Sequence, residues 1–538
     1  MARGHGGDAA AAALRALGVP HVFSLSGGHV FPIFDGCHRA GIRVIDVRHE
    51  QTAGFAAEGW ARLTRSPGVA VVTAGPGVTN VVSPLAQARF NRAPVVVLAG
   101  RAPGFRWGQG SLQEIDHVPF VDPIAPAATV GAAADVARRI VAAATDAATP
   151  PRGPVFLDFP LEVLFDDAEL DAPEPAPPAA AAPDAGAVDA VARVLAGARR
   201  PVVVAGSNVW LDRAEHALRA FARAARAPVF TNGQGRGCIP ADDELAFARS
   251  RSRALRAADV VVVAGTPLDF RLGFGASFAP GAAIVHLDSH ESLLARHVDC
   301  EAALAAPLDA ALGALAAAVE RPCDSKEWLA ELRATEDAKR AEAAAEACSD
   351  AAPIHPLRVF AELVPLLERD AVVVGDGGDF VSYAGREIPS YEPGCWLDPG
   401  PFGCLGCGFG YALAARLAHP GRQVVLLLGD GAFGFAGMEL ETLVRHGLPV
   451  VCVVGNNGIW GLEKHPMRAL YGYDVAADLR PGIRYDEVAE AFGGRGELVT
   501  DPAELRGALE RALAAGEPAL VNVVTDPSVA YPRSANLA

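Results

Sequence analysis

The stretch VVLLLGDGAFGFAGMELETLVRHGLPVVCVVGNNGIWG, residues 424–461, contains two apolar runs that each end in small and polar residues. The first run leads into Gly429-Asp430-Gly431, and the second leads into Asn456-Asn457. Continuous Val/Leu runs separated by a helix-like segment are typical of neighbouring strands in a parallel sheet covered on both faces. Because the carboxyl ends of such strands meet at one edge of the sheet, we expect Asp430 and Asn457 to lie side by side.

Asp430 and Asn457 offer a carboxylate and an amide oxygen, which are hard ligands suited to Mg²⁺. Mg²⁺ binds proteins mostly together with the phosphate groups of a substrate or cofactor. The pair therefore predicts a diphosphate that is held through a metal ion. A second Gly-Asp-Gly, at residues 375–377, has no Asn-Asn at a matching distance. We interpret it as an ordinary turn after a strand, whose loop can line a pocket.

The same alternation of short aliphatic runs and helical stretches extends over the chain and divides it into three blocks. The blocks are residues 1–170, 187–335 and 352–525; a Pro/Ala-rich linker at 171–186 separates the first two, and the tail 526–538 could act as a lid. We predict an α/β protein with three doubly wound parallel-sheet domains. Ligands are expected at the carboxyl ends of the strands.

Composition limits the classes of function that are open to the protein. The 538 residues carry a formal net charge of -16, which argues against nucleic acid as a partner. The chain lacks an uninterrupted apolar run of about 18 residues, so no membrane span is expected. Its start does not have a signal-peptide pattern, and the nine cysteines show no disulfide framework. These features predict a cytoplasmic protein.

The Gly-Asp-Gly at 429–431 with the distant Asn456-Asn457 resembles the signature of thiamine diphosphate-dependent enzymes. The resemblance implies that block 352–525 is the diphosphate-binding domain and block 187–335 a central, nucleotide-like domain. It also implies that Asp430, Asn457 and the main-chain carbonyl of Ile459 hold Mg²⁺. In GCLGCGFGYALAA, residues 403–415, Leu405 falls where the family has the bulky residue that bends the cofactor.

The family also requires a glutamate in its first, pyrimidine-binding domain. In VIDVRHEQTAGFAAEGWAR, Glu50 follows a strand-like run and opens a helix, and TAGPGVTN at 73–80 matches the same domain. By resemblance, Glu50 hydrogen-bonds to the aminopyrimidine ring and promotes loss of the C2 proton by general base catalysis. The alternative is an ordinary partner of the helix dipole. A non-catalytic regulatory protein of this fold could lack Glu50, so its presence favours an enzyme.

The family's site lies between the first domain of one subunit and the third domain of another, which implies a homodimer or homotetramer. The catalytic candidates are Glu50, Gln113 and His29. The resemblance implies that the cofactor is contacted by Glu50, Pro76, Gly77, Asn80, Gly403, Leu405, Gly429, Asp430, Gly431, Ala432, Asn457, Ile459 and Trp460.

The substrate is less clearly indicated, because different segments resemble different members of the family. SLSGGHVFPIFDG at 24–36 resembles acetolactate synthases, which condense pyruvate with a 2-oxo acid. Gln113 in SLQEIDHV matches a glutamine near the reacting centre in acetolactate synthases and also in acyl-CoA lyases. The segments 403–415 and 251–275 resemble 2-hydroxyacyl-CoA lyases and oxalyl-CoA decarboxylases. We expect a 2-hydroxyacyl-CoA lyase that releases formyl-CoA, with acetolactate synthase as the alternative. ADP or FAD in the central domain stays open. Thr266-Pro267 replaces an arginine that contacts ADP in the decarboxylases, and the segment 251–275 lacks the Arg-Phe-Asp-Asp run expected of flavin-binding acetolactate synthases.

An acyl-CoA substrate needs basic side chains for its phosphates, and the segment 248–256 offers several arginines. The guanidinium suits phosphate because its planar fork donates two hydrogen bonds at once. The alternative is a solvated helix face. The candidates for substrate contacts are Arg249, Arg251, Arg253, Glu463 and Tyr383.

Overall fold

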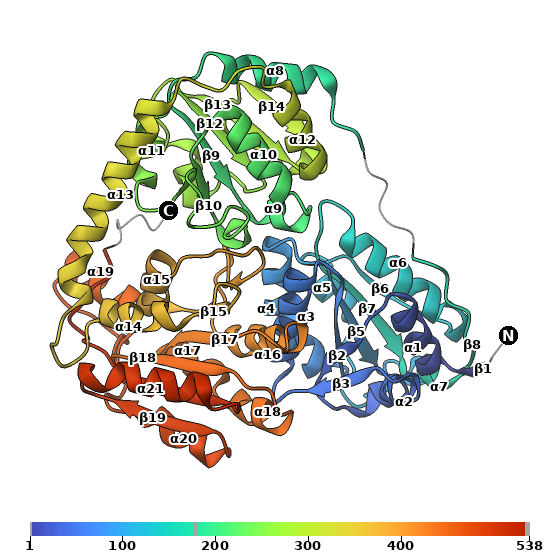
Figure 1. Ribbon diagram of the computed structural model, residues 1–538. Coiled ribbons are helices and arrows are strands. Elements are labelled where there is room, and N and C mark those ends of the chain that lie inside the picture. Colours follow the sequence, from blue (N-terminus) through green and yellow to red (C-terminus); the bar gives the residue numbers. More distant parts are fainter. Residues whose placement is uncertain (1–2, 176–180, 533–538) are drawn as a thin grey trace.

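The protein is described by a computed structural model that covers residues 3–175 and 181–532. Figure 1 shows three lobes in chain order, and each contains one six-stranded parallel sheet with helices around it. The predicted fold class of three doubly wound parallel-sheet domains is therefore confirmed. Parts of the predicted linker and tail, residues 176–180 and 533–538, lie outside the described residues.

The first sheet has the strand order β3-β2-β4-β5-β7-β6. Its strands are β2 (His21–Ser24), β3 (Arg43–Asp46), β4 (Gly68–Val72), β5 (Val95–Arg101), β6 (Ala127–Thr129) and β7 (Val155–Pro160). The helices are α1 (Gly6–Ala16), α2 (Phe31–Ala40), α3 (Glu50–Thr64), α4 (Pro76–Phe90), α5 (Val118–Val121), α6 (Val136–Ala148) and α7 (Leu161–Phe165). A short antiparallel pair, β1 (Arg3–His5) with β8 (Asp167–Glu169), ties the beginning of this domain to its end.

The central sheet has the order β11-β10-β9-β12-β13-β14. Its strands are β9 (Pro201–Ala205), β10 (Val229–Thr231), β11 (Ala246–Phe247), β12 (Val260–Ala264), β13 (Ala283–Asp288) and β14 (Ala302–Ala305). The helices are α8 (Ala185–Ala196), α9 (Ser207–Leu211), α10 (Glu215–Ala225), α11 (Arg251–Ala257), α12 (Leu308–Ala318) and α13 (Lys326–Ala347). The long helix α13 leads from this domain down to the third (Figure 1).

The third sheet has the order β16-β15-β17-β18-β20-β19. Its strands are β15 (Val372–Asp376), β16 (Trp396–Leu397), β17 (Val424–Gly429), β18 (Val451–Asn456), β19 (Arg495–Val499) and β20 (Ala519–Val524). The helices are α14 (Pro356–Leu363), α15 (Gly378–Glu387), α16 (Gly408–Ala418), α17 (Asp430–Ala436), α18 (Glu439–Arg445), α19 (Gly461–Tyr471), α20 (Tyr485–Ala491) and α21 (Pro502–Ala514). Gly429 pairs with Gly455, so the turns after β17 and β18 leave the sheet at the same level.

Each sheet has a switch point next to its first strand, where successive connections of the chain lead to opposite sides. In the third domain the chain moves outward from β15 to β16 and then returns to β17, so the reversal lies between β15 and β17. The equivalent points lie between β2 and β4 in the first domain and between β9 and β12 in the central domain. Ligands of open α/β sheets bind in the crevice at such switch points.

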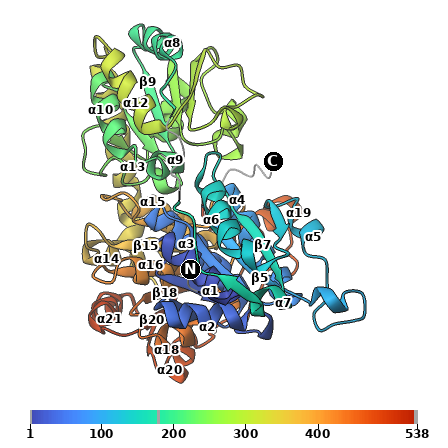
Figure 2. The same ribbon diagram turned by 90° about the vertical axis from the view of Figure 1, so that its right-hand side faces the viewer.

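Helix α3 of the first domain packs across helix α16 of the third, and Figure 2 shows the two domains in close contact. Small residues permit this approach: a Cβ on Gly410 would lie 2.8 Å from the Cβ of Phe55. Arg62 of α3 is 2% exposed and links all three domains. Its guanidinium donates to Gln234 of the central domain and to Tyr411 of the third, at 3.2 and 3.0 Å. In the described parts of the chain, no helix has the length and apolar character needed to cross a bilayer.

Candidate active site

The carboxylate of Asp430 lies at the switch point of the third domain, directly after β17. Its two oxygens accept hydrogen bonds from the backbone amides of Gly431 and Gly458, at 2.9 and 2.7 Å. The side chain is buried, and this burial raises the pKa of Asp430 from 3.8 to about 6. The carboxylate is thus held in one orientation, in an environment where a cation is needed to stabilise its charge.

The adjacent residues Asn456 and Asn457 point in different directions. Asn456 is buried, and its amide donates to Asn522 and to the carbonyl of Ile483, both at 3.0 Å. The amide nitrogen of Asn457 instead donates to Asp379 at 3.3 Å, on the side of Asp430. The first asparagine therefore stabilises the sheet edge, and the second faces the candidate metal site.

Asp379 was not identified in the sequence, although it lies in the same GDGGD turn as the second Gly-Asp-Gly motif. It lies in the first turn of α15, and a Cβ on Gly461 would come within 2.5 Å of its carboxylate. Burial is the main cause that raises its pKa, and the carboxylates of Asp379 and Asp430 repel each other. Asp379 could have been found from the sequence, because it is a second acidic residue in a Gly-rich turn at the end of a strand.

The second Gly-Asp-Gly, at residues 375–377, supports the neighbouring Gly-rich turn at residues 403–408. The carboxylate of Asp376 accepts from the amides of Gly406 and Gly408, at 3.1 and 2.8 Å, and burial raises its pKa to about 7. Leu405 lies in this turn and presses against Gly377, where a Cβ would be only 2.4 Å from the Leu405 side chain. Asp376 therefore fixes the turn that carries Leu405.

Other predicted cofactor residues of the third domain line the same edge. Gly431 lies against the ring of Trp460, since a Cβ there would be 2.4 Å from the indole. Ala432 is buried in the first turn of α17 and faces Gly377. Gly403 has a φ of +76°, which a residue with a side chain rarely adopts. Packing therefore requires a small residue at Gly431, and the backbone conformation favours glycine at Gly403.

The first domain brings Glu50 and Asn80 together. Glu50 is the first residue of α3, is 6% exposed, and accepts a hydrogen bond from the amide of Asn80 at 3.0 Å. Its other oxygen faces Gly77, where a Cβ would lie 3.6 Å away. Pro76 and Gly77 open α4, so the carboxylate faces the turn between β4 and that helix.

His29 and Gln113 meet at Thr73, which follows β4. The ring Nδ1 of His29 lies 3.2 Å from the Thr73 hydroxyl, and that hydroxyl donates to the Gln113 side chain at 3.4 Å. Burial lowers the pKa of His29, so its imidazole is neutral at pH 7. The structure thus gathers all three catalytic candidates around the switch point of the first domain.

The first and third domains also contact each other within the chain, close to these residues. Gln51, next to Glu50, donates to the carbonyl of Leu405 at 3.4 Å. The backbone amide of Arg48 donates to both carboxylate oxygens of Glu439, at 3.0 and 3.1 Å. These contacts hold the start of α3 against the Gly-rich turn of the third domain.

A buried relay behind the Thr73 turn was not identified in the sequence, and no local pattern marks it. The amide of Gly75 donates to His117 Nε2 at 3.0 Å, and His117 Nδ1 lies 2.9 Å from Asp158. Since Nε2 is an acceptor, the ring proton is on Nδ1 and points at Asp158. Arg101 also donates to Asp158, at 2.9 Å. The relay fixes Gly75, whose φ is +60° and which packs against Gln113.

We expect Asp158→Asn to loosen the turn at Gly75. An asparagine can donate to His117 Nδ1, which moves the ring proton to Nε2. The Gly75 amide and His117 Nε2 are then both donors, so their hydrogen bond is lost. Breaking the buried pair with Arg101 also destabilises the fold, by about 3 kcal/mol. Hydrogen exchange of the peptide that contains Gly75 should become faster in the variant without cofactor. Unchanged protection of that amide would contradict the relay.

The donor set suits Mg²⁺ with a diphosphate. Among residues 3–175 and 181–532, no three His, Cys, Asp or Glu side chains gather as a metal site. Asp430 and Asn457 offer one carboxylate and one amide oxygen, which leaves most coordination positions to the phosphates and waters that Mg²⁺ prefers.

Comparison with known proteins identifies the family. The N-terminal, central and C-terminal domain models of the thiamine pyrophosphate enzymes match residues 4–120, 188–315 and 376–523. The chain belongs to the thiamine pyrophosphate enzyme family. Each match falls within one of the three sheet domains, and the two outer models are those named for cofactor binding.

Two groups of relatives of this thiamine pyrophosphate enzyme carry different names. The acetolactate synthase large subunit of Mycobacterium tuberculosis is 56% identical over 99% of the chain and 98% of its own length. A 2-hydroxyacyl-CoA lyase 2 of Caenorhabditis elegans is 34% identical over 97% of the chain and 89% of its own length. The human 2-hydroxyacyl-CoA lyase 2 is 32% identical over 92% of the chain and 85% of its length. The expectation of a lyase is thus less well supported than its alternative.

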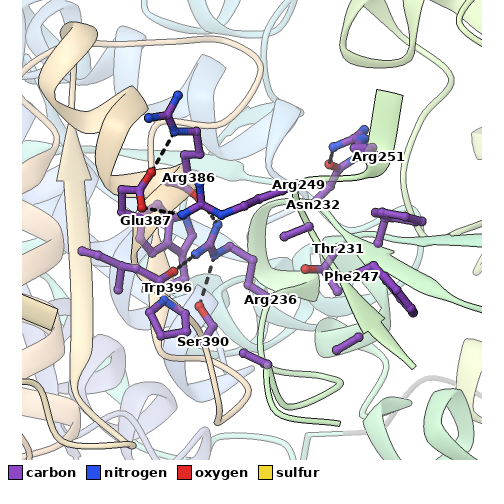
Figure 3. Close-up of a pocket in the computed structure, with 18 of the residues that line it drawn as sticks. Thr231, Asn232, Arg236, Phe247, Arg249, Arg251, Arg386, Glu387, Ser390 and Trp396 are labelled. Carbon is purple, nitrogen blue, oxygen red and sulfur yellow. Dashed lines mark hydrogen bonds and ion pairs between the residues drawn. The ribbon is translucent and has the colours of Figure 1, made fainter. Parts of the chain in front are cut away.

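The structure places the substrate candidates of this thiamine pyrophosphate enzyme in different parts of the molecule. Arg249 and Arg251 line a cavity between the central and third domains (Figure 3), whereas the exposed Arg253 pairs with Glu331 on the outer surface. Tyr383 is buried and donates to the carbonyl of Ala530, so it anchors the chain before the tail. Glu463 is exposed in the first turn of α19.

The neighbouring asparagines make a matched test of the metal site. We expect Asn457→Ala to weaken Mg²⁺-dependent binding of thiamine diphosphate by about tenfold or more, with little effect on stability. Asn456→Ala should instead lower the free energy of unfolding by about 2 kcal/mol, because it leaves buried partners unpaired. Cofactor titrations and urea unfolding of both variants check this. If only Asn456→Ala lost affinity for Mg²⁺, then Asn456 and not Asn457 would contribute to the metal site.

Proposed function

We propose that this enzyme requires Mg²⁺ with thiamine diphosphate and condenses two 2-oxo acids with loss of CO₂, as an acetolactate synthase does. The observation that carries the proposal is the 56% identity, over nearly the full length of both chains, to relatives named acetolactate synthase. In further support, His29 lies in the segment 24–36 that resembles acetolactate synthases, and Thr73 joins it to Gln113 close to Glu50.

The residues at the two sheet edges fit the cofactor. Asp430, Asn457 and the carbonyl of Ile459 would hold Mg²⁺ and the diphosphate, while Leu405 and Trp460 would enclose the thiazolium. When bound, thiamine diphosphate supplies the electron sink for forming or breaking the bond beside a carbonyl. Glu50 would hold a proton between its free oxygen and the aminopyrimidine ring, because Asn80 occupies only one carboxylate oxygen.

The neutral imidazole of His29 is placed to accept or return a proton on the substrate side, with its Nδ1 fixed by Thr73. Gln113 would orient the substrate carboxylate or carbonyl. The family arrangement further leads us to propose a homodimer or homotetramer with shared sites. In support, large apolar side chains are exposed on the segment that carries Gln113, among them Phe105, Trp107 and Leu112.

A second function is favoured by a different observation. The cavity between the central and third domains has a volume of about 760 Å³ and is lined by arginines, which two small 2-oxo acids do not require. Helix α15 connects it to the active site, since Asp379 at one end approaches Asn457 and Arg386 at the other lines the cavity. A 2-hydroxyacyl-CoA could therefore extend from the cavity to the cofactor.

A pair of assays with the full-length protein, thiamine diphosphate and Mg²⁺ tests the proposal. One reaction receives pyruvate and is analysed for acetolactate; the other receives a short 2-hydroxyacyl-CoA and is analysed for formyl-CoA. We expect acetolactate at the higher kcat/KM. Formyl-CoA as the sole product would replace the proposed function by the lyase.

A further inference from the structure

One lysine is buried beside the candidate metal site. The chain has three lysines, Lys326, Lys339 and Lys464, among its 47 basic residues. Lys464 lies near the start of α19, shortly after Ile459, and its side chain is 10% exposed. Lysine side chains are almost never buried without a partner, so the groups that bind this ammonium group indicate what it does.

Lys464 joins the start of α19 to the segment that follows this helix. Its ammonium group makes a short ion pair with Asp478, and the carboxylate of Asp474 lies 3.5 Å from the same nitrogen. Its backbone amide donates to the carbonyl of Trp460 at 2.8 Å. Residues 474–481, which we call the bracing segment, are therefore connected through one side chain to the turn after β18.

The bracing segment also pairs directly with that turn. The amide of Trp460 donates to the carbonyl of Ala477 at 2.9 Å, and the amide of Leu479 donates to the carbonyl of Gly458 at 2.8 Å. These two hydrogen bonds flank an antiparallel bridge. Ala477 is buried, so the contact is packed as well as hydrogen-bonded.

The bridge determines the direction of a backbone group that the proposed metal site needs. Its central residues are Ile459 and Asp478. Between two flanking hydrogen bonds of an antiparallel pair, the amide and carbonyl of the central residues point away from the partner strand. The amide of Ile459 accordingly donates on the far side, to Asn457 Oδ1 at 3.2 Å. Its carbonyl points to the same side, because both groups of one residue in an antiparallel strand project in the same direction.

Residues 458–460 are held from both sides. On the metal side, the amide of Gly458 donates to Asp430 at 2.7 Å. On the other side, a Cβ on Gly458 would lie 3.2 Å from Pro481 of the bracing segment, and the φ of Gly458 is +69°. The position of the Ile459 carbonyl therefore depends on the bracing segment as well as on the candidate metal ligands.

We propose that Lys464 is a positioning residue for the metal site: its pair with Asp478 holds the bracing segment against residues 458–460 and so fixes the carbonyl of Ile459 toward Mg²⁺. Residues that orient metal ligands without touching the metal typically change its affinity by about 10- to 100-fold. Lysine suits this place, because a compact ammonium group fits between two carboxylates of one segment more readily than a planar guanidinium group. The inference rests on the Mg²⁺ site of the proposed function and adds to it a residue outside the Gly-Asp-Gly and Asn-Asn motifs.

Titration of Mg²⁺ into the full-length protein, with thiamine diphosphate present, tests the role of Lys464. Lys464→Met keeps the apolar stem but removes the charge, and it should weaken Mg²⁺ binding at least about tenfold. Lys339→Met is the matched control, because Lys339 Nζ donates to the carbonyl of Arg249 in the central domain, at 2.8 Å. Its Mg²⁺ affinity should be unchanged.

Asp478→Asn tests the same pair from its exposed side. The Asp478 side chain is 67% exposed, so this substitution should leave folding intact. It should also weaken Mg²⁺ binding, and the double variant with Lys464→Met should lose no more affinity than Lys464→Met alone. Losses that add in the double variant would contradict the pair.

Hydrogen exchange in the protein without metal and cofactor gives a readout that is independent of binding. The amides of Trp460 and Leu479 should exchange faster in Lys464→Met, because they donate the two hydrogen bonds beside the bridge. A role in stability alone would instead lower the temperature of thermal unfolding and leave both the Mg²⁺ affinity and these two amides unchanged. That result would overturn the inference.

Asp430→Asn separates a failure of this inference from a failure of the proposed function. If Asp430→Asn weakens Mg²⁺ binding and Lys464→Met does not, Lys464 has no positioning role and the metal site stands. If neither substitution changes the affinity, the proposed metal site is wrong and the inference falls with it. An equal loss of affinity in Lys339→Met would also overturn the inference, because the effect would then not be specific to the metal site.

Discussion

Glu50→Gln is expected to lower kcat by about a thousandfold or more while thiamine diphosphate and Mg²⁺ still bind within a few-fold of their normal affinity. The carboxylate is buried, holds one hydrogen bond from Asn80, and directs its second oxygen toward Gly77. A glutamine keeps the size and the contact with Asn80 but cannot carry the proton, and a positioned acid or base contributes about 10²–10⁴ in rate. Steady-state kinetics and quenching of tryptophan fluorescence by the cofactor separate the two effects.

Glu58 provides a control on the same helix. It is fully buried, accepts from Asn91 and Gln87 at 2.7 and 3.3 Å, and lies 3.6 Å from Arg62. Glu58→Gln should therefore lower stability by about 3 kcal/mol, because it leaves Arg62 without its carboxylate, and should leave the kcat of the folded fraction unchanged. Near-normal turnover in Glu50→Gln would remove Glu50 from the chemistry and leave it as a partner of the helix terminus.

The sheets were predictable because their signal is local. The apolar runs at 424–428 and 451–454 are strands because a strand covered on both faces must be apolar on both, and this reads directly as a continuous Val/Leu run. Asp430 and Asn457 follow from the same logic, since parallel register places the ends of adjacent strands at one level. The three predicted catalytic candidates also lie in segments that follow the ends of strands.

Contacts across long sequence distances were not predictable. His117 and Asp158 are 41 residues apart, and Arg62 joins three domains. The arginine cluster shows the same limit within one helix: Arg251 and Arg253 are two positions apart on α11, which separates them by about 200° around the axis. One therefore lines the cavity and the other pairs with Glu331 outside it.

Asp430→Asn is expected to weaken Mg²⁺-dependent binding of thiamine diphosphate by about a hundredfold, or about 2.7 kcal/mol. The substitution preserves shape and one acceptor but removes the negative charge that a divalent cation needs from the protein. Asp526→Asn is the control, because Asp526 lies just beyond β20 at the same edge, and within the described residues its carboxylate accepts hydrogen bonds only from Ser528 in its own turn. Its cofactor affinity should be unchanged.

The protein without metal allows an independent check of the same residue, through the pH dependence of stability. Burial raises the pKa of Asp430 from 3.8 to about 6, so the folded state disfavours the ionised form. This destabilisation is absent below pH 3.8, grows as the pH rises, and is complete above about pH 6. The stability of Asp430→Asn relative to the unsubstituted protein should therefore rise by about 2.4 kcal/mol between pH 4 and pH 7. Hydrogen bonds lost in the variant cancel in this difference, because they do not titrate. If this difference in stability did not change with pH, burial would not raise the pKa of the Asp430 carboxylate.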